Sequence, residues 1–115
     1  MNAQLLNNIQ DTHLAIWNER SRKKRDSMIA DLYTDDIKMY DPNFILNGSE
    51  AVSDFIDKVQ SDPKFAFKAI KPMDRTQNGM RLFWSIETEN GLLTGMDLFI
   101  LEHEKVKHLY VFIEG

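Results

Sequence analysis

The sequence contains no cysteine, and it has only three prolines and five glycines in 115 residues. The absence of cysteine excludes a disulfide framework, a thiolate nucleophile, an iron–sulfur cluster and a Cys-ligated zinc site. No apolar run approaches the roughly 18 residues that indicate a membrane span. Residues 1–10 also lack the charged and apolar segments of a secretory signal. We therefore expect a soluble, cytoplasmic protein with no membrane partner.

What is present is the composition of a single globular domain over residues 1–115. Hydrophobic residues make up 43% of the chain and charged residues 28%, which excludes a disordered chain. The formal net charge of −4 argues against a nucleic-acid partner. The chain has no GxGxxG, P-loop, GxSxG, HExxH or EF-hand pattern, so we expect no cofactor and no metal.

Apolar residues recur at helical spacing in the first half of the chain. Residues 3–20 place Ile16 and Trp17 on one helix face, with His13 at the centre of that face. A second helix is expected over residues 22–33, with Ser21 as its N-cap. A third helix is expected where an apolar stripe begins at residue 51 and ends at residue 59. These helices make up most of the N-terminal half.

Other segments have the pattern of strands: 37–40, 65–75, 80–89, 92–102 and 106–114. A short segment, 44–46, lies between the first of these strands and the third helix. The dipeptides Asn78-Gly79 and Asn90-Gly91 are typical of type I′ hairpin turns. A third turn is expected at residues 104–105. Helices followed by consecutive hairpins predict an α+β domain, with three N-terminal helices on one face of a curved antiparallel sheet.

The segment 92–101 is apolar on both faces, with Phe99 and Leu101 on one and Met96 and Leu98 on the other. A one-sided antiparallel sheet alternates apolar with polar residues, so both faces of this strand call for cover. The helices can cover one face. We expect the outer sheet face to bind a second copy and give a homodimer, the alternative being a monomer with an apolar sheet back.

Asp97 is the first candidate for chemistry, because it shares a strand face with apolar neighbours and follows Gly95. A carboxylate there is costly unless it is hydrogen-bonded, paired or protonated. It either points into a pocket as a general acid or base, or is a structural group bound to a helix residue or to backbone, or reaches solvent because the strand is twisted. Asp41, before Pro42, is either a second carboxylate facing the same cavity or an ordinary turn starter whose side chain binds the following backbone.

His13 and Trp17 lie one helical turn apart, so they face the same surroundings. The imidazole is suited to relaying a proton and the indole N–H to donating to a carbonyl, whereas both residues also serve as ordinary core groups. Five cations between residues 20 and 25 are interpreted as a solvated connection rather than an anion site. The acids and histidines of residues 102–108 alternate between strand faces, which argues against a metal site there.

Several motifs in order resemble the nuclear transport factor 2-like superfamily, and within it the polyketide-cyclase-like (SnoaL-like) and ketosteroid-isomerase-like proteins. They are Trp17-Asn18, the run Leu32-Tyr33-Thr34-Asp35-Asp36 leading to Asp41-Pro42, Asn47-Gly48-Ser49-Glu50-Ala51, Gly95-Met96-Asp97, and the closing strand from residue 106 to residue 113. The likeness covers nearly the whole chain in order and spacing.

This resemblance implies a cone-shaped, cystatin-like sheet with an apolar pocket at its open end and a dimer through the sheet back. It implies that Asp41 matches the isomerase base, and that Asp97 matches the aspartic acid that ketosteroid isomerase keeps protonated by apolar surroundings. Trp17 stands where the isomerase has its oxyanion-hole tyrosine, and this difference argues against ketosteroid isomerisation itself. An acid in the cavity also resembles the cyclases, where it moves protons during aldol closure, and Asp97 fits that role.

We therefore expect a pocket for a small apolar molecule, without a cofactor, in which Asp41, Asp97 and His13 move a proton next to a carbonyl. The predicted substrate-binding residues are aromatic: Trp17, Tyr33, Phe44, Phe55, Trp84 and Phe99. Two alternatives stay open. One is a non-catalytic binding protein, and the other is a protein-interaction adaptor of the same fold.

Overall fold

The computed structural model describes residues 3–114. It contains α1 (Ala3–Asn18), α2 (Arg22–Leu32) and α3 (Ser49–Val59), close to the predicted helices. Ser21 is the N-cap of α2, because its hydroxyl accepts a hydrogen bond from the backbone N–H of Lys24 over 3.4 Å. In this part of the chain no helix is long and apolar enough to cross a membrane.

The strands form one sheet in the order β2-β1-β7-β6-β5-β3, with β4 paired to β5. Their bounds are β1 Tyr33–Tyr40, β2 Ile45–Asn47, β3 Ala66–Ala69, β4 Asp74–Thr76, β5 Gly79–Thr88, β6 Gly91–Glu102 and β7 Lys105–Ile113. The α+β class with a curved sheet and three helices is confirmed. The expectation of an all-antiparallel sheet is wrong at one pair, because β1 and β7 run parallel. The long excursion between them is the kind of crossover that parallel pairing requires.

Two predicted strand boundaries are wrong. The segment 65–75 is not one strand but β3 and β4, separated by residues 70–73, which contain Pro72. Proline cannot donate to a strand ladder, so the interruption has a local cause. β1 begins at Tyr33, four residues before the expected start, and therefore takes that tyrosine out of the second helix.

The predicted hairpins are present, but the third turn is formed by residues 103–104 rather than 104–105, and the turn types differ from the prediction. In the β4–β5 turn only Gln77 has a positive φ (54°), and in the β5–β6 turn Gly91 does (111°). A type I′ turn needs positive φ at both central residues. That requirement is met in the β6–β7 turn instead, where His103 and Glu104 have φ of 51° and 66°.

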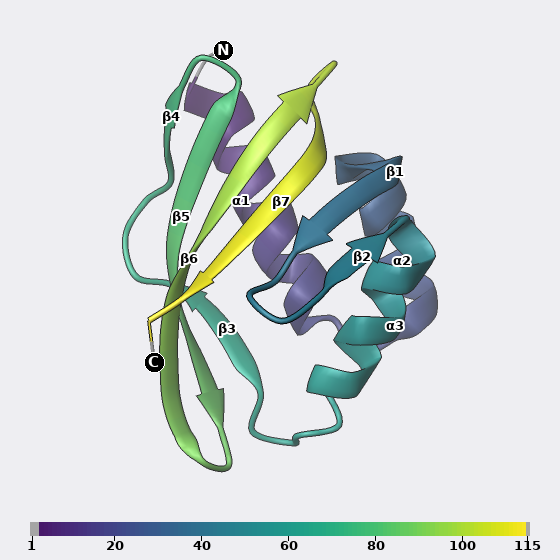
Figure 1. Cartoon of the computed structure of the whole chain (residues 1–115), viewed down its shortest axis with the longest axis vertical. Helices are drawn as coiled ribbons and strands as arrows, with labels where there is room; N and C mark the ends of the chain where they lie inside the picture. Colours follow the sequence, from purple (N-terminus) through teal and green to yellow (C-terminus); the bar gives the residue numbers. More distant parts are fainter. Residues whose placement is uncertain (1–2, 115) are drawn as a thin grey trace.

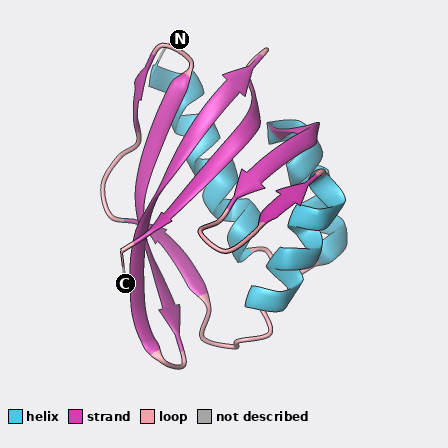
Figure 2. Ribbon diagram, in the orientation of Figure 1, coloured by secondary structure: helices cyan, strands magenta, loops and turns pink. Residues whose placement is uncertain are grey.

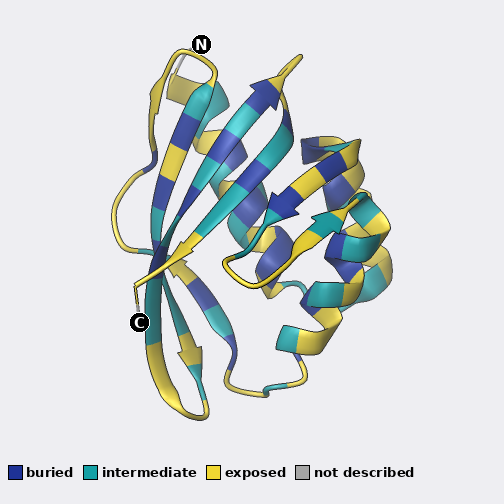
Figure 3. Cartoon of the chain, viewed as in Figure 1, coloured by how far each residue is buried: buried dark blue, intermediate teal, exposed yellow. Residues whose placement is uncertain are grey.

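The helices lie on one side of the sheet (Figures 1 and 2), with α1 behind the long strands β5, β6 and β7. Buried and less buried residues alternate along β5 and β6, as the banding in Figure 3 shows. Asn18 fixes the end of α1 to β3 through two 2.8 Å bonds with the backbone of Phe67. This contact sets the position of the adjacent Trp17 relative to the sheet.

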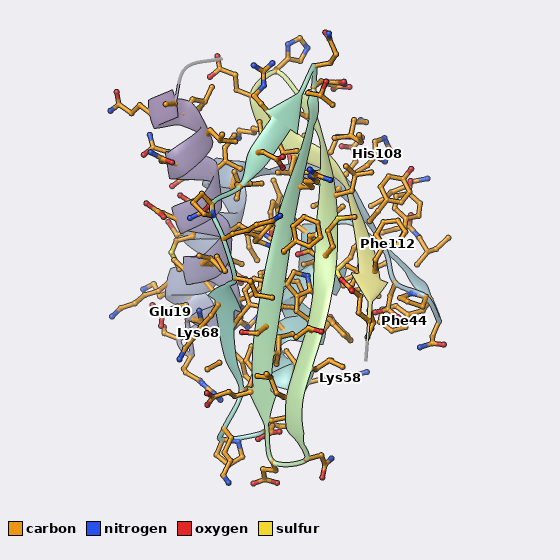
Figure 4. All side chains as sticks on the ribbon, turned by 90° about the vertical axis from the view of Figure 1, so that its left-hand side faces the viewer. Glu19, Phe44, Lys58, Lys68, His108 and Phe112 are labelled. Carbon is orange, nitrogen blue, oxygen red and sulfur yellow. The ribbon has the colours of Figure 1, made fainter. Side chains whose placement is uncertain are left out.

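The outer face of the sheet is apolar and only partly covered. Met96, Leu98 and Ile100 of β6 point to this face and are half-buried, and Phe112 of β7 is 49% exposed. Figure 4 shows His108 and Phe112 projecting on the side away from α1. The rings of Tyr40 and Tyr110 stack at 4.3 Å between centroids. β6 is thus apolar on both faces of the sheet, as the sequence predicts.

The prediction of a solvated connection between α1 and α2 holds for Lys23 and Lys24, which are exposed, but is wrong for Arg25. Arg25 is fully buried and donates to the Ser53 hydroxyl and carbonyl, the Gln60 amide oxygen, the Glu19 carbonyl and the Asp57 carboxylate. Arg20 donates to backbone carbonyls of the segment after α3, and Arg22 to two aspartates of α3. Arg22 and Arg25 have partners here because α2 packs against α3, which supplies acceptors for both.

Candidate functional site

A cavity of about 370 Å³ opens between α1, α3 and the inner face of the sheet. Its aromatic walls are Trp17, Phe55, Phe65, Phe67 and Trp84. Aliphatic side chains complete the apolar lining: Met39, Val59, Ile86, Leu93, Val111 and Ile113. The polar lining residues are Asp41, Lys58, Asp62, Thr88, Asn90 and Asp97.

Asp97 is the buried polar group of this cavity. It is 4% exposed, whereas the other polar residues named above as lining the cavity are half-buried or exposed. The indole Nε1–H of Trp84 donates to Oδ1 of Asp97 over 2.9 Å. His13 Nε2 lies 3.1 Å from the other carboxylate oxygen, Oδ2. A carboxylate can be kept in this apolar setting because each oxygen has a hydrogen-bond partner.

Gly95 makes the bond between Trp84 and Asp97 sterically possible. Gly95 is the cross-strand partner of Trp84. A Cβ at this position would lie far inside van der Waals contact with the Trp84 ring and the Phe112 carbonyl. Without a side chain at residue 95, the indole lies over β6 and its N–H reaches the carboxylate two residues further on.

The hydrogen bonds continue behind His13 through Tyr33 to Trp17. His13 Nδ1 lies 2.6 Å from the hydroxyl of Tyr33, and Trp17 Nε1–H donates to that same hydroxyl over 3.1 Å. His13 is fully buried and Tyr33 is 1% exposed. Five side chains from α1, β1, β5 and β6 therefore form one buried chain of hydrogen bonds: Trp17, Tyr33, His13, Asp97 and Trp84.

The chemistry of these groups indicates which of them donates and which accepts in each hydrogen bond. Burial raises the pKa of the Tyr33 hydroxyl far above its ordinary value, so the hydroxyl keeps its proton. It already accepts from Trp17, and its own O–H is then available to donate to Nδ1 of His13. With Nδ1 of His13 accepting from Tyr33, Nε2 is the ring nitrogen that carries a proton and donates to Oδ2 of Asp97. Asp97 ends the chain as the acceptor, with an N–H donor on each of its oxygens.

The rim of the cavity is fixed by Asp62, in the loop after α3. Its carboxylate accepts from the backbone N–H of Lys64 and from that of Glu89 at the β5–β6 hairpin, both at 2.9 Å. These backbone bonds hold the pKa of Asp62 below its usual range. The hairpin tip and the loop after α3 are thereby joined beside the opening.

The predicted catalytic residues occupy three different positions. Asp97 lines the cavity and His13 lies directly behind it. Asp41 also lines the cavity and is half-buried, but its Oδ1 accepts a 3.0 Å bond from the backbone N–H of Asn43. Asp41 therefore has both properties that the sequence left as alternatives, since it begins the turn and also faces the cavity.

The predicted substrate-binding residues divide into two groups. Trp17, Phe55 and Trp84 are in the cavity wall. Tyr33 and Phe99 lie outside the wall, and Phe99 packs edge-on against His13 with 4.6 Å between ring centroids. Phe44 also lies outside the wall and contacts Phe55 at 5.1 Å between centroids.

Sequence reasoning missed a set of wall residues that share a simple signal. Five of them lie on strands, two or four residues from another lining residue, and the sixth directly precedes β3: Phe67, Ile86, Leu93, Val111 and Ile113, and then Phe65. Period two in strands places such residues on one face. Starting from Trp84 and Asp97 on the inner face, this rule adds Ile86 on β5 and Leu93 on β6, whereas the residues of β3 and β7 also require the facing of those strands.

Within residues 3–114 no three His, Asp or Glu side chains come together as they would to hold a metal ion. In the last hairpin, His108 Nδ1 lies 3.0 Å from the hydroxyl of Tyr40, on the outer face of the sheet. His103 and Glu104 form the turn itself. These side chains thus belong to the outer face and the turn.

No protein-family model matches the sequence, and no curated protein matches it. Solved structures do resemble it. One is a proposed isomerase of the SnoaL-like family from Agrobacterium tumefaciens, with a TM-score of 0.86, 22% identity, and 97% of this chain and 99% of that chain covered.

Two further structures share the fold at lower identity. A nuclear transport factor 2-like protein from Cytophaga hutchinsonii has a TM-score of 0.69 and 18% identity, with 92% of this chain and 89% of that chain covered. A proposed polyketide cyclase from Sinorhizobium meliloti has a TM-score of 0.76 and 8% identity, with 96% and 99% covered. These likenesses confirm the resemblance found in the sequence at the level of the fold.

Proposed function

We propose that this chain, whose fold is that of the nuclear transport factor 2-like proteins, binds a small apolar molecule in the cavity and moves a proton next to a carbonyl. The observation that carries the proposal is Asp97, a buried carboxylate that faces an apolar cavity and ends a chain of hydrogen bonds. A carboxylate with restricted access to water is well suited to proton transfer to and from carbon.

In this reaction Asp97 accepts a proton from the carbon next to the carbonyl, and the C–H electron pair moves into an enolate. Asp97 then returns the proton to another position of the same molecule, which is an isomerisation. In a cyclase the enolate carbon instead attacks a second carbonyl of the substrate, and the proton passes to the new alkoxide. Both reactions conserve composition and charge, so neither needs an added oxidant or reductant.

His13 acts as a positioning residue in this scheme. Its Nε2–H holds Oδ2 of Asp97, and the Tyr33 hydroxyl behind it fixes the tautomer. Asp41 is the second carboxylate of the cavity and lies on a half-buried turn. Two carboxylates with different burial in one cavity supply a more and a less hydrated group for acid and base roles.

Exchange of α-hydrogens in heavy water tests the proposal without knowledge of the natural substrate. The probe is 1-tetralone, whose loss of α-proton signal is followed by proton NMR with and without protein. We expect catalysed exchange by the wild type, and a loss of about 100-fold or more in Asp97→Asn, the range for a lost general base. Asp31→Asn, an exposed carboxylate on α2, is the matched control and retains the activity. Equal exchange by Asp97→Asn and wild type would remove Asp97 from the chemistry.

We propose in addition that the outer sheet face binds a second copy of the chain. The support is its partly covered apolar surface around Leu98 and Phe112. Light scattering after size exclusion measures the mass directly. We expect a dimer for the wild type and a monomer for Leu98→Lys, whereas a monomeric wild type would leave this face for another partner, as in an adaptor.

A further inference from the structure

The inner part of the cavity is rich in hydrogen-bond acceptors and poor in free donors. The indole N–H of Trp17 is engaged by Tyr33, that of Trp84 by Asp97, and the imidazole N–H of His13 by Asp97. The Asp97 carboxylate has about four acceptor positions and uses two of them for these donors. A ligand group that reaches Asp97 therefore meets unused acceptor positions, while the neighbouring donors are already bonded.

Donors at the opening do not change this asymmetry. The hydroxyl of Thr88 donates to the carbonyl of Gly91 over 2.8 Å. Lys58 is exposed on the last turn of α3, and Asn90 is exposed in the hairpin tip. A carbonyl oxygen near Asp97 would face a carboxylate oxygen, and this repulsion has no compensating hydrogen bond.

The walls around the acceptor also favour positive charge. Trp17, Phe67 and Trp84 present aromatic rings, which attract cations through their faces. Among the residues that line the cavity, Asp41, Asp62 and Asp97 are carboxylates, whereas Lys58 is the one cationic side chain that residues 3–114 contribute to the lining. Buried carboxylates gain most from a partner that supplies both a hydrogen bond and the opposite charge.

We infer that the cavity selects apolar molecules that carry a protonated amine, with the ammonium group bonded to Asp97 and the hydrocarbon body against the aromatic walls. The inference rests on the proposed function only in taking the cavity as the ligand site, and it assigns the free acceptor positions of Asp97 to an ammonium group rather than to a proton taken from carbon. For a substrate that also holds a carbonyl, the same asymmetry orients the carbonyl oxygen toward the opening and Lys58 rather than toward Asp97.

Four compounds share one ring skeleton and differ in the group that would meet Asp97: 1-aminotetralin, 1-tetralol, 1-tetralone and tetralin. Comparing them separates the effect of charge and hydrogen-bond donation from that of apolar contact. Their dissociation constants are measured by isothermal titration calorimetry at neutral pH. We expect the amine to bind at least about tenfold more tightly than the alcohol, ketone or hydrocarbon, in line with hydrogen bonds to charged groups. In Asp97→Asn the amine should lose that advantage, while tetralin binds as it does to the wild type.

Asp31→Asn again serves as the control, because it removes one exposed carboxylate and so changes net charge equally. It should leave the order of the four affinities unchanged. Equal or tighter binding of the alcohol or the ketone would overturn the inference. An amine preference that survives in Asp97→Asn would also overturn it, since the preference would then come from overall charge.

The outcomes for this inference and for the proposed function are separable. Amine selectivity that depends on Asp97, without exchange of 1-tetralone protons, would support the ligand class and refute the catalytic role. Exchange that depends on Asp97, without amine selectivity, would refute the ligand class and leave the catalytic proposal standing. Absence of binding by all four compounds would refute the ligand class.

Discussion

Replacing Tyr33 with phenylalanine tests the buried hydrogen-bond chain by removing one oxygen atom. The hydroxyl is the partner of both Trp17 Nε1 and His13 Nδ1, at 3.1 and 2.6 Å. Each buried polar group left unpaired costs about 1–3 kcal/mol. The unpaired Nδ1 of His13 should incur the full penalty, because His13 is fully buried. The penalty at Trp17 should be smaller, because Trp17 also borders the cavity, where water can reach it. We therefore expect the free energy of unfolding to fall by about 2–4 kcal/mol.

Urea denaturation of the wild type and the variant, followed by far-UV circular dichroism, measures this change if the slope of the transition is unchanged. Tyr110→Phe is the matched control, since it removes a hydroxyl from the half-buried outer face of the sheet. Its expected effect is within about 0.5 kcal/mol. An equal, small effect of both substitutions would refute the assignment of Tyr33 as the link between Trp17 and His13.

Three other substitutions test separate parts of the structure. Gly95→Ala should cost about 1–3 kcal/mol in urea denaturation and alter the near-UV circular dichroism of Trp84, because the added Cβ overlaps the indole; an unchanged spectrum would contradict the packing. Arg25→Leu should cost about 2–3 kcal/mol, below the cost for a fully buried ion pair, because the Asp57 side chain is 44% exposed; a loss under about 1 kcal/mol would contradict this. The folded-state pKa of Asp62 is lowered by its backbone bonds, so the stability it contributes is present above its unfolded pKa of about 4 and is lost as the pH falls through the lower folded value. Melting temperatures measured from about pH 6 to about pH 3 should accordingly fall more for the wild type than for Asp62→Asn, and parallel curves would refute the contribution.

The elements that follow from local chemistry were predictable from the sequence. The apolar stripes gave the three helices, and alternation along residues 92–101 placed Asp97 among buried neighbours on the inner face. The hairpins were found from their Asn-Gly dipeptides. Their turn types were not, because strand register decides which residues are central, and it left Gly79 and Gly91 paired within the ladder.

The features that depend on long-range pairing were not predictable. The parallel pairing of β1 with β7 joins segments about 70 residues apart, and no local pattern encodes it. The role of Tyr33 was missed for a related reason. It was assigned to the end of a helix, whereas the first position of β1 turns its side chain toward His13. Arg25 was misread because the acceptors on α3 that bury it lie about 30 residues away in the sequence.

The central claim is that Asp97 is the hydrogen-bond acceptor at the end of a chain that runs from Trp17 through Tyr33 and His13. The protonation of the His13 ring reports this directly, and it is measured by proton–nitrogen NMR of the ¹⁵N-labelled protein at neutral pH, with assignment by His13→Gln. We predict a proton on Nε2, shared with Asp97, and a bare Nδ1 that accepts from Tyr33. A proton on Nδ1 with a bare Nε2 would reverse the chain, make Asp97 the donor, and contradict the account.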